Sequence, residues 1–174
     1  MALLDQLTGG DFRSIGQSGQ VAAAVLADPA LFPELFAGLS HADALVRMRA
    51  ADATEKVTAA RPDLLQPFKV RLLKEIAAID QKEVRWHVAQ MIPRLMLTAS
   101  ERNKAVIILK NYLGDKSGIV RTFSMQALAE LAGQDESLKP EIYSLVKHLM
   151  RTGTPAMKTR GRKLLKTLQP KLRL

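Results

Sequence analysis

The chain's three histidines, His41, His87 and His148, are the side chains best suited to acid–base or metal chemistry near neutral pH. No two of them have the i, i+4 spacing of metal ligands on one helix, and the chain contains no cysteine. Its serines show no pattern that pairs a nucleophile with a base. We therefore expect no catalytic residue, no metal site and no cofactor, and we expect that the protein is not an enzyme.

Two further stretches carry residue types used in phosphate or acid–base chemistry. The segment GGDFRSIGQSG, residues 9–19, is rich in glycine, but no strand pattern precedes it and no Gly-Lys-Ser/Thr ends it, so it does not match a phosphate-binding loop. We predict a poorly ordered edge there. Asp135 and Glu136 are adjacent carboxylates in a predicted inter-helix loop, which is typical of a solvated turn.

The elements that would position any site follow from a repeat in the sequence. A hydrophobic residue followed by a basic one recurs about every 37 residues. The pairs are Val46-Arg47, Val84-Arg85, Val120-Arg121 and Met157-Lys158, and a weaker copy begins at Phe12-Arg13. From each of the four pairs, mostly apolar or small residues continue at the spacing of one helical face. The repeat therefore predicts a row of helices.

A second helix is expected in each copy. Its start is marked by Pro33, Pro67, Asn103 and Pro140. Asp80 and Glu83 have the spacing of a capping box at the start of the helix that carries Val84. Thr154 and Pro155 have the residue types of a cap and a first helical position. Pro93 falls in mid-helix and should kink that helix, because the proline ring removes one backbone hydrogen bond.

The period, the two-helix unit and the valine-arginine pair together resemble HEAT repeats. The resemblance implies an all-α fold, a right-handed α-solenoid (α-α superhelix) of four to five helix pairs. It implies a single domain over residues 1–174, with approximate repeats 11–40, 41–79, 80–115, 116–153 and 154–174, the last being a partial repeat or cap. Proteins of this kind most often hold protein partners on the concave side. A class with DNA glycosylase activity uses several aromatics in a basic cleft, a composition that this chain's eight aromatics do not favour.

Trp86, the only tryptophan, lies nearly opposite the predicted buried face of its helix, so we expect it on or near the outer face, partly packed between repeats. Arg47, Arg85 and Arg121 occupy one column. The resemblance implies that such arginines tie neighbouring repeats together through carboxylates and helix-end carbonyls. A phosphate-binding track is the alternative.

Partner-binding residues are expected on the side of the second helices opposite their apolar faces, where the surface is mildly basic with apolar islands. We predict these to be Val70, Lys74, Lys104, Ile107, Lys110, Asn111, Ser144, Lys147, His148 and Arg151. This mixture suits a protein or an acidic amphipathic peptide, and we expect no small-molecule substrate.

The net charge of +9 is concentrated near the C-terminus, where eight of the 26 Lys and Arg residues follow His148 and no acid accompanies them. The cations predicted to contact an anion or a nucleic acid are Lys158, Arg160, Arg162, Lys163 and Lys166. The same residues also fit the polar outer face of a helix that caps a solenoid. Both interpretations stay open, as does contact with an acidic membrane surface.

Composition limits the class of protein further. Hydrophobic residues make up 47% of the chain and charged residues 25%, which is typical of a folded domain. The longest apolar run, VAAAVLA at residues 21–27, is too short to span a membrane. The absence of cysteine fits a reducing compartment, and we expect a cytoplasmic protein.

Overall fold

The computed structural model describes residues 2–169, which form helices and connecting loops and no strand. The predicted all-α class is therefore confirmed over this range. The chain divides into two compact units, Met1–Met96 and Leu97–Leu174. Their boundary falls inside the predicted repeat 80–115, so the two helices of that repeat belong to different units. The end of the predicted repeat 154–174 lies outside the described residues, and one continuous repeat domain stays a prediction.

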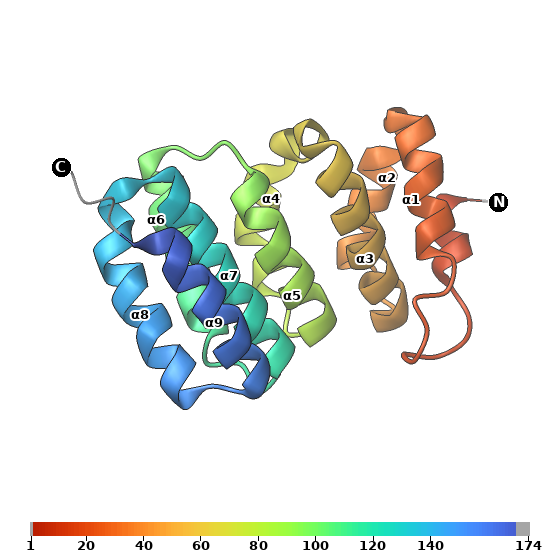
Figure 1. The fold of residues 1–174 in the computed structure, drawn as a ribbon. Coiled ribbons are helices and arrows are strands. Elements are labelled where there is room, and N and C mark those ends of the chain that lie inside the picture. Colours follow the sequence, from red (N-terminus) through yellow and green to blue (C-terminus); the bar gives the residue numbers. More distant parts are fainter. Residues whose placement is uncertain (1, 170–174) are drawn as a thin grey trace. The chain divides into compact units, whose positions relative to one another are not determined.

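The N-terminal unit (Met1–Met96) is built around one long helix, α3 (Ala44–Ala60), which packs against both α1 (Ser18–Ala27) and α5 (Lys82–Met91) (Figure 1). Its other elements are η1 (Leu3–Leu7), η2 (Pro29–Leu31), α2 (Phe32–Ala37), η3 (Gly38–Ser40), η4 (Pro62–Phe68), α4 (Lys69–Lys74), η5 (Ile76–Ala78) and η6 (Ile92–Arg94). The predicted apolar ladder of α3 is buried completely: Val46, Ala50, Thr54 and Val57 have no exposed surface.

An aromatic cluster fills the side of this unit formed by α2 and η4. The ring of Phe36 lies 4.6 Å from that of Phe68, and the ring of Phe32 lies 5.5 Å from Phe68 in an edge-to-face arrangement, as centroid distances. Phe32 and Phe36 are buried, with Leu35 between them. Burial of side chains of this size contributes roughly 1.5–3 kcal/mol each.

Two of the predicted helices in this unit are shorter than expected. The second helix of the repeat 41–79 is divided into α4 and η5, and α4 itself has six residues. Pro93 does more than kink its helix. It ends α5 at Met91, and Ile92–Arg94 continues as a 3-10 turn.

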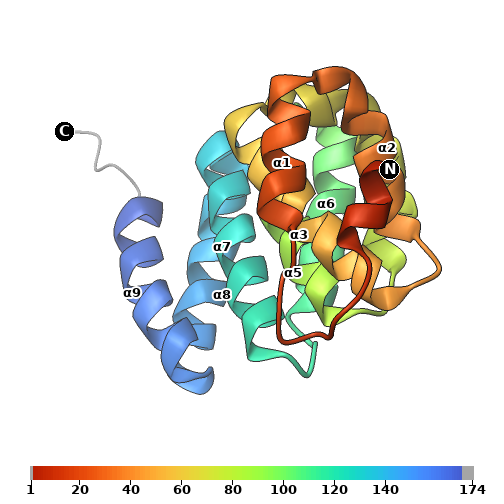
Figure 2. The same cartoon turned by 90° about the vertical axis from the view of Figure 1, so that its right-hand side faces the viewer.

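The segment before α1 corrects a sequence prediction. Phe12 and Arg13, proposed as the start of a weak repeat copy, lie in an exposed loop between η1 and α1 (Figure 2). Arg49 of α3 organises this loop, because its guanidinium donates to the carbonyls of Leu7 at 2.8 Å, Gly9 at 2.6 Å and Ser14 at 3.2 Å. The predicted poorly ordered edge is thus a loop wrapped around an arginine that is only 3% exposed.

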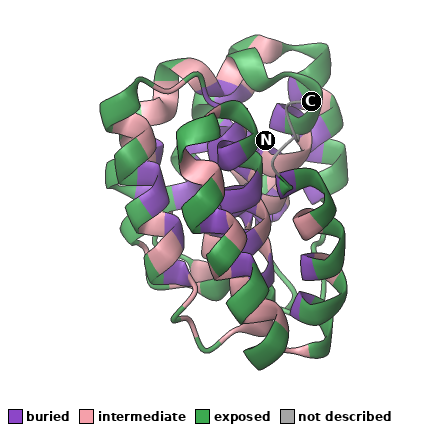
Figure 3. Ribbon diagram, turned by 60° about the vertical axis from the view of Figure 1, so that its left-hand side comes forward, coloured by how far each residue is buried: buried purple, intermediate pink, exposed green. Residues whose placement is uncertain are grey.

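The C-terminal unit (Leu97–Leu174) contains α6 (Ala99–Tyr112), α7 (Gly118–Gln134), η7 (Glu136–Leu138), α8 (Lys139–Thr152) and α9 (Pro155–Leu168). Helix α9 packs against both α7 and α8 (Figures 1 and 2). In both units the buried positions lie on the faces that neighbouring helices turn toward one another, and exposed positions lie outward (Figure 3). Met157 and Leu168 of α9 follow this pattern, since each is 1% exposed, while Leu165 of the same helix is half-buried.

The helix caps confirm one prediction and correct two. Thr154 accepts a hydrogen bond from the Met157 amide, and Pro155 is in the first turn of α9. Helix α6 begins at Ala99 rather than near Asn103, because Thr98 and Glu101 form a capping box. Asp80 and Glu83 form none: α5 is preceded by Gln81, and Asp80 pairs instead with Arg85 at 3.0 Å.

Candidate functional site

A buried polar network in the N-terminal unit brings together side chains that the sequence did not associate. The carboxylate of Asp52 on α3 accepts hydrogen bonds from the Ser18 hydroxyl and the Lys56 ammonium, both at 2.5 Å. Nε2 of His87 on α5 lies 3.7 Å from Oδ1 of the same carboxylate. Burial raises the pKa of Asp52, but contacts with His87, Lys56 and Ser18 outweigh it and hold that pKa well below its usual value of 3.8. Asp52 is therefore a carboxylate that joins α1, α3 and α5.

This network does not have the geometry of a nucleophilic site. Ser18 and His87 both contact Asp52, and no hydrogen bond joins Ser18 to His87 in the described structure. Ser18 also has no exposed surface for a substrate to reach. His87 is occupied on both ring nitrogens, by the Glu83 carbonyl at 2.6 Å and by the indole N–H of Trp86 at 3.1 Å. The arrangement is that of a structural contact between helices.

Trp86 is half-buried, as its position beside the predicted outer face suggested. Its Nε1–H donates to Nε2 of His87, and the two rings lie 5.3 Å apart between centroids. Nε2 of His87 thus lies between the indole N–H and the Asp52 carboxylate, while Nδ1 of the same ring faces the Glu83 carbonyl. The tryptophan thereby orients the buried histidine.

Two members of the arginine column make contacts of the kind that the resemblance implies. Arg47 donates to the carbonyls of His41 and Ala42 and to Oε1 of Gln81 at 2.8 Å. Arg85 bonds the Ile79 carbonyl and pairs with Asp80. Arg121 differs, since its buried Nε has no hydrogen-bond partner among the described residues. The guanidinium groups of Arg47 and Arg85 therefore bind carbonyls at helix ends.

The predicted partner-binding residues fall in both units. Val70 and Lys74 lie on α4 of the N-terminal unit, where both are exposed, Val70 by 53%. The remaining eight lie on α6 and α8 of the C-terminal unit. Seven of those are exposed, which agrees with their predicted position opposite the apolar faces: Lys104, Ile107, Asn111, Ser144, Lys147, His148 and Arg151.

We call the exposed sides of α6 and α8 the α6–α8 face, represented by Lys104, Ile107, Lys147, His148 and Arg151. Ile107 is 58% exposed, a large apolar side chain among polar ones. Lys104, Lys147 and Arg151 have no acidic partner among the described residues. The face therefore combines an apolar side chain with uncompensated positive charge.

Lys110 is the exception on this face, because it is half-buried and its ammonium pairs with the Glu141 carboxylate. That pair joins α6 to α8. Arg102 makes a second link to the segment before α8, donating to Asp135 at 2.8 Å. Lys110 is therefore better described as a residue that positions the α6–α8 face than as one free to bind a partner.

The predicted anion-contact residues all lie on α9. Lys158, Arg162, Lys163 and Lys166 are exposed, and Arg160 is half-buried with its guanidinium 5.8 Å from the centroid of the Phe123 ring on α7. No acidic partner for any of the five exists among residues 2–169. This helix is the most concentrated set of unneutralised cations in the described part of the chain.

Other chemistry finds little support among residues 2–169. No group of three His, Asp or Glu side chains there is close enough to hold a metal ion. His41 accepts the Asp43 amide on Nδ1, and His148 is exposed on α8. None of the described helices is both long enough and apolar enough to cross a membrane.

Comparisons with known protein families, curated proteins and solved structures find no match to this chain. Among the described residues, the cations of α9 and those of the α6–α8 face other than Lys110 have no acidic partner.

Proposed function

We propose that the protein is a non-enzymatic binding module that holds an acidic, amphipathic segment of a protein partner on the α6–α8 face. One observation carries the proposal: α6 and α8, which the Lys110–Glu141 pair joins, expose Ile107 together with Lys104, Lys147 and Arg151, and none of these three cations has an acidic partner among the described residues. An amphipathic peptide would place an apolar side chain on Ile107 and carboxylates near the cations.

The contacts within the unit support the same interpretation. The Lys110–Glu141 pair and the Arg102–Asp135 bond hold α6 and the start of α8 in place. A partner would thus meet a preformed surface and would not have to order it, which lowers the entropic cost of binding.

The repeat architecture is part of this proposal. We infer a HEAT-like, right-handed stack of helix pairs in which second helices form the binding side. Support comes from the repeat in the sequence and from the exposure of Val70, Ile107 and Ser144 at its matching positions.

A direct test uses a fluorescein-labelled peptide of about 15 residues that alternates leucine pairs with glutamates in a helical pattern. Anisotropy titrations would compare the wild type with Lys147→Glu/Arg151→Glu. The matched control, Lys158→Glu/Arg162→Glu, makes the same changes of residue type on α9. We expect an affinity loss of about tenfold for the α8 variant and less than about twofold for the control. Equal losses in the two variants would contradict a specific face.

A nucleic acid is the second candidate partner, favoured by the five cations of α9. Neutralising several phosphates releases counterions, so the affinity for a duplex should fall steeply with salt. Titration of a 20-base-pair DNA duplex at increasing salt tests this candidate. Absence of binding at low salt would eliminate it.

A further inference from the structure

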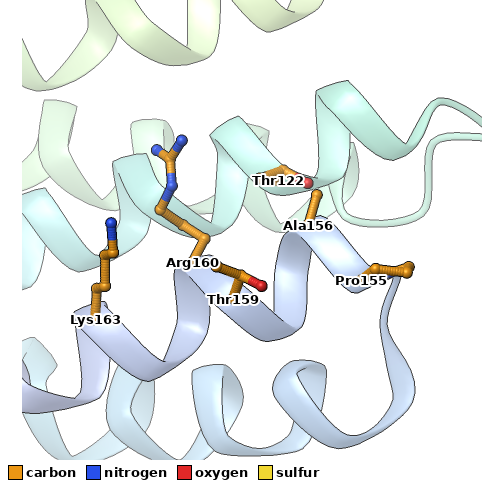
Figure 4. A pocket seen from close by; sticks show the side chains of 6 residues that line it. All are labelled: Thr122, Pro155, Ala156, Thr159, Arg160 and Lys163. Carbon is orange, nitrogen blue, oxygen red and sulfur yellow. The ribbon is translucent and has the colours of Figure 1, made fainter.

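We propose that the hollow between α7 and α9 binds a phosphate group, a site independent of the α6–α8 face. The hollow has a volume of about 440 Å³, within the range of small-ligand pockets. Its walls are formed by Thr122, Pro155, Ala156, Thr159, Arg160 and Lys163 (Figure 4). Only Thr122 comes from α7, so the polar groups are concentrated on one helix.

The charges around the hollow favour an anion. Both ionisable residues in its lining, Arg160 and Lys163, are cations, and they extend from α9 on the side that faces α7 (Figure 4). No carboxylate lines the hollow or pairs with either cation among residues 2–169. A ligand that brings negative charge would supply the missing partner.

Arg160 is held in place before any ligand binds. Its guanidinium lies over the ring of Phe123, which is half-buried on α7. This cation–π contact restricts the side chain, so that less rotamer freedom is lost on binding than for a free surface arginine.

The donor set fits phosphate better than carboxylate. Arg160 offers a planar fork of N–H groups, and Lys163 offers a mobile ammonium. Thr159 accepts a weak bond from Arg162 at 3.4 Å, which leaves its own O–H free to donate. Thr122 instead donates its hydroxyl proton to the Gly118 carbonyl at 2.7 Å, so it lines the hollow without offering a donor to the ligand. Three different donors around one space match the several oxygens of a phosphate.

Two sources could supply the phosphate: free inorganic phosphate, or a small organic monoester whose organic part lies against Pro155 and Ala156. These two residues form an apolar edge of the hollow (Figure 4). The experiment therefore uses inorganic phosphate, adenosine 5′-monophosphate and adenosine as separate probes. Tighter binding of the nucleotide than of inorganic phosphate indicates a monoester, and equal affinity indicates free phosphate.

The chain provides matched variants for the test. Arg160→Gln and Lys163→Gln remove the lining cations, whereas Lys158→Gln and Lys166→Gln remove exposed cations of the same helix that do not line the hollow. Titrations followed by the amide resonances of residues 159–163 should show that phosphate affinity falls about tenfold in each lining variant and changes less than about twofold in each control. Because Arg160 also contacts Phe123, the exposed Lys163 provides the variant that is independent of folding.

Three results would overturn the proposal. These are no resonance shifts with either phosphate probe, equal losses in lining and control variants, and binding of adenosine as tight as that of the nucleotide. Equal losses would mean diffuse attraction to a basic helix, and equal binding of adenosine would mean that the phosphate is not recognised.

Discussion

The basic side chains of α3 and η6 in the N-terminal unit and those of α9 in the C-terminal unit have opposite roles. In the N-terminal unit, carbonyl and carboxylate oxygens of the same unit accept hydrogen bonds from Arg47, Arg49, Lys56 and Arg94. Arg94, for example, donates to the Glu55 carbonyl, the Glu55 carboxylate and the Thr58 hydroxyl. On α9 the cations have no acidic partner among the described residues. The number of charges is therefore a poor guide to function. What distinguishes the two regions is whether the packing already supplies a partner.

Among the variants that test this comparison, Arg49→Met has the largest expected effect on stability. The substitution removes the guanidinium bonds to the 8–17 loop and leaves several carbonyls without donors, so we expect the free energy of unfolding to fall by about 3 kcal/mol. Arg162→Met on α9 is the matched control, with an expected change of about 0.5 kcal/mol or less. Urea denaturation followed by circular dichroism measures both. Similar losses in the two variants would remove the distinction between the regions.

Asp52→Asn tests the electrostatic part of the buried network. The pKa of Asp52 is depressed in the folded protein, so its stabilising contribution is complete above the unfolded-state pKa of about 3.9 and is lost as the pH falls toward the folded value. We expect a cost of about 2 kcal/mol at pH 7 that shrinks steadily below about pH 4. Denaturation at pH 7 and pH 3, with Trp86 fluorescence as the probe, measures the difference. A cost that is the same at both pH values would contradict it.

Gly16→Ala tests how tightly the loop fits around Arg49. Gly16 has φ of +54°, and a Cβ there would lie 2.8 Å from the Arg49 guanidinium carbon. We expect a loss of about 1–2 kcal/mol, because both the backbone and the contact resist a side chain. Gly19→Ala is the control, since no atom lies within 4 Å of its Cβ position and the residue is on α1, where alanine is favoured. If Gly16→Ala left the melting temperature unchanged, the loop would not be tightly packed around Arg49.

The smallest expected effect belongs to Lys158→Gln/Lys166→Gln. Both side chains are exposed on α9, so their neutralisation should change the free energy of unfolding by no more than about 0.5 kcal/mol. Thermal melts of the double variant and the wild type provide the measurement. A loss well above this size would mean that the cations of α9 stabilise the fold.

Much of the helical structure could be predicted because helix periodicity and caps depend on neighbouring residues. The buried ladders 46–57 and 84–95 and the cap at Thr154 were predicted correctly. The start of α6 at Ala99, instead of near Asn103, is also encoded locally, because Thr98 and Glu101 have the capping-box spacing. The prediction of a weak repeat copy at Phe12-Arg13 was wrong for another reason. These residues lie in a loop whose conformation depends on hydrogen bonds to Arg49, which is distant in the sequence.

For the candidate sites, the sequence indicated which side chains would be exposed, but not which of them would lack an ion-pair partner within the chain. Ile107, Lys147 and the cations of α9 were placed correctly at the surface. Lys110 has the same residue type and spacing, yet it pairs with Glu141 across α6 and α8. The association of Ser18 and Asp52 could not be predicted, since the two residues are 34 positions apart in the chain.

By itself the sequence determined the helical class, the repeat of about 37 residues and the concentration of basic residues on the last helix. These properties depend on composition and on spacings of a few residues. Only the tertiary structure decided which cations are neutralised, because Arg49 meets its carbonyl partners 35 to 42 positions away. Such contacts form when helices pack, and no local pattern encodes them.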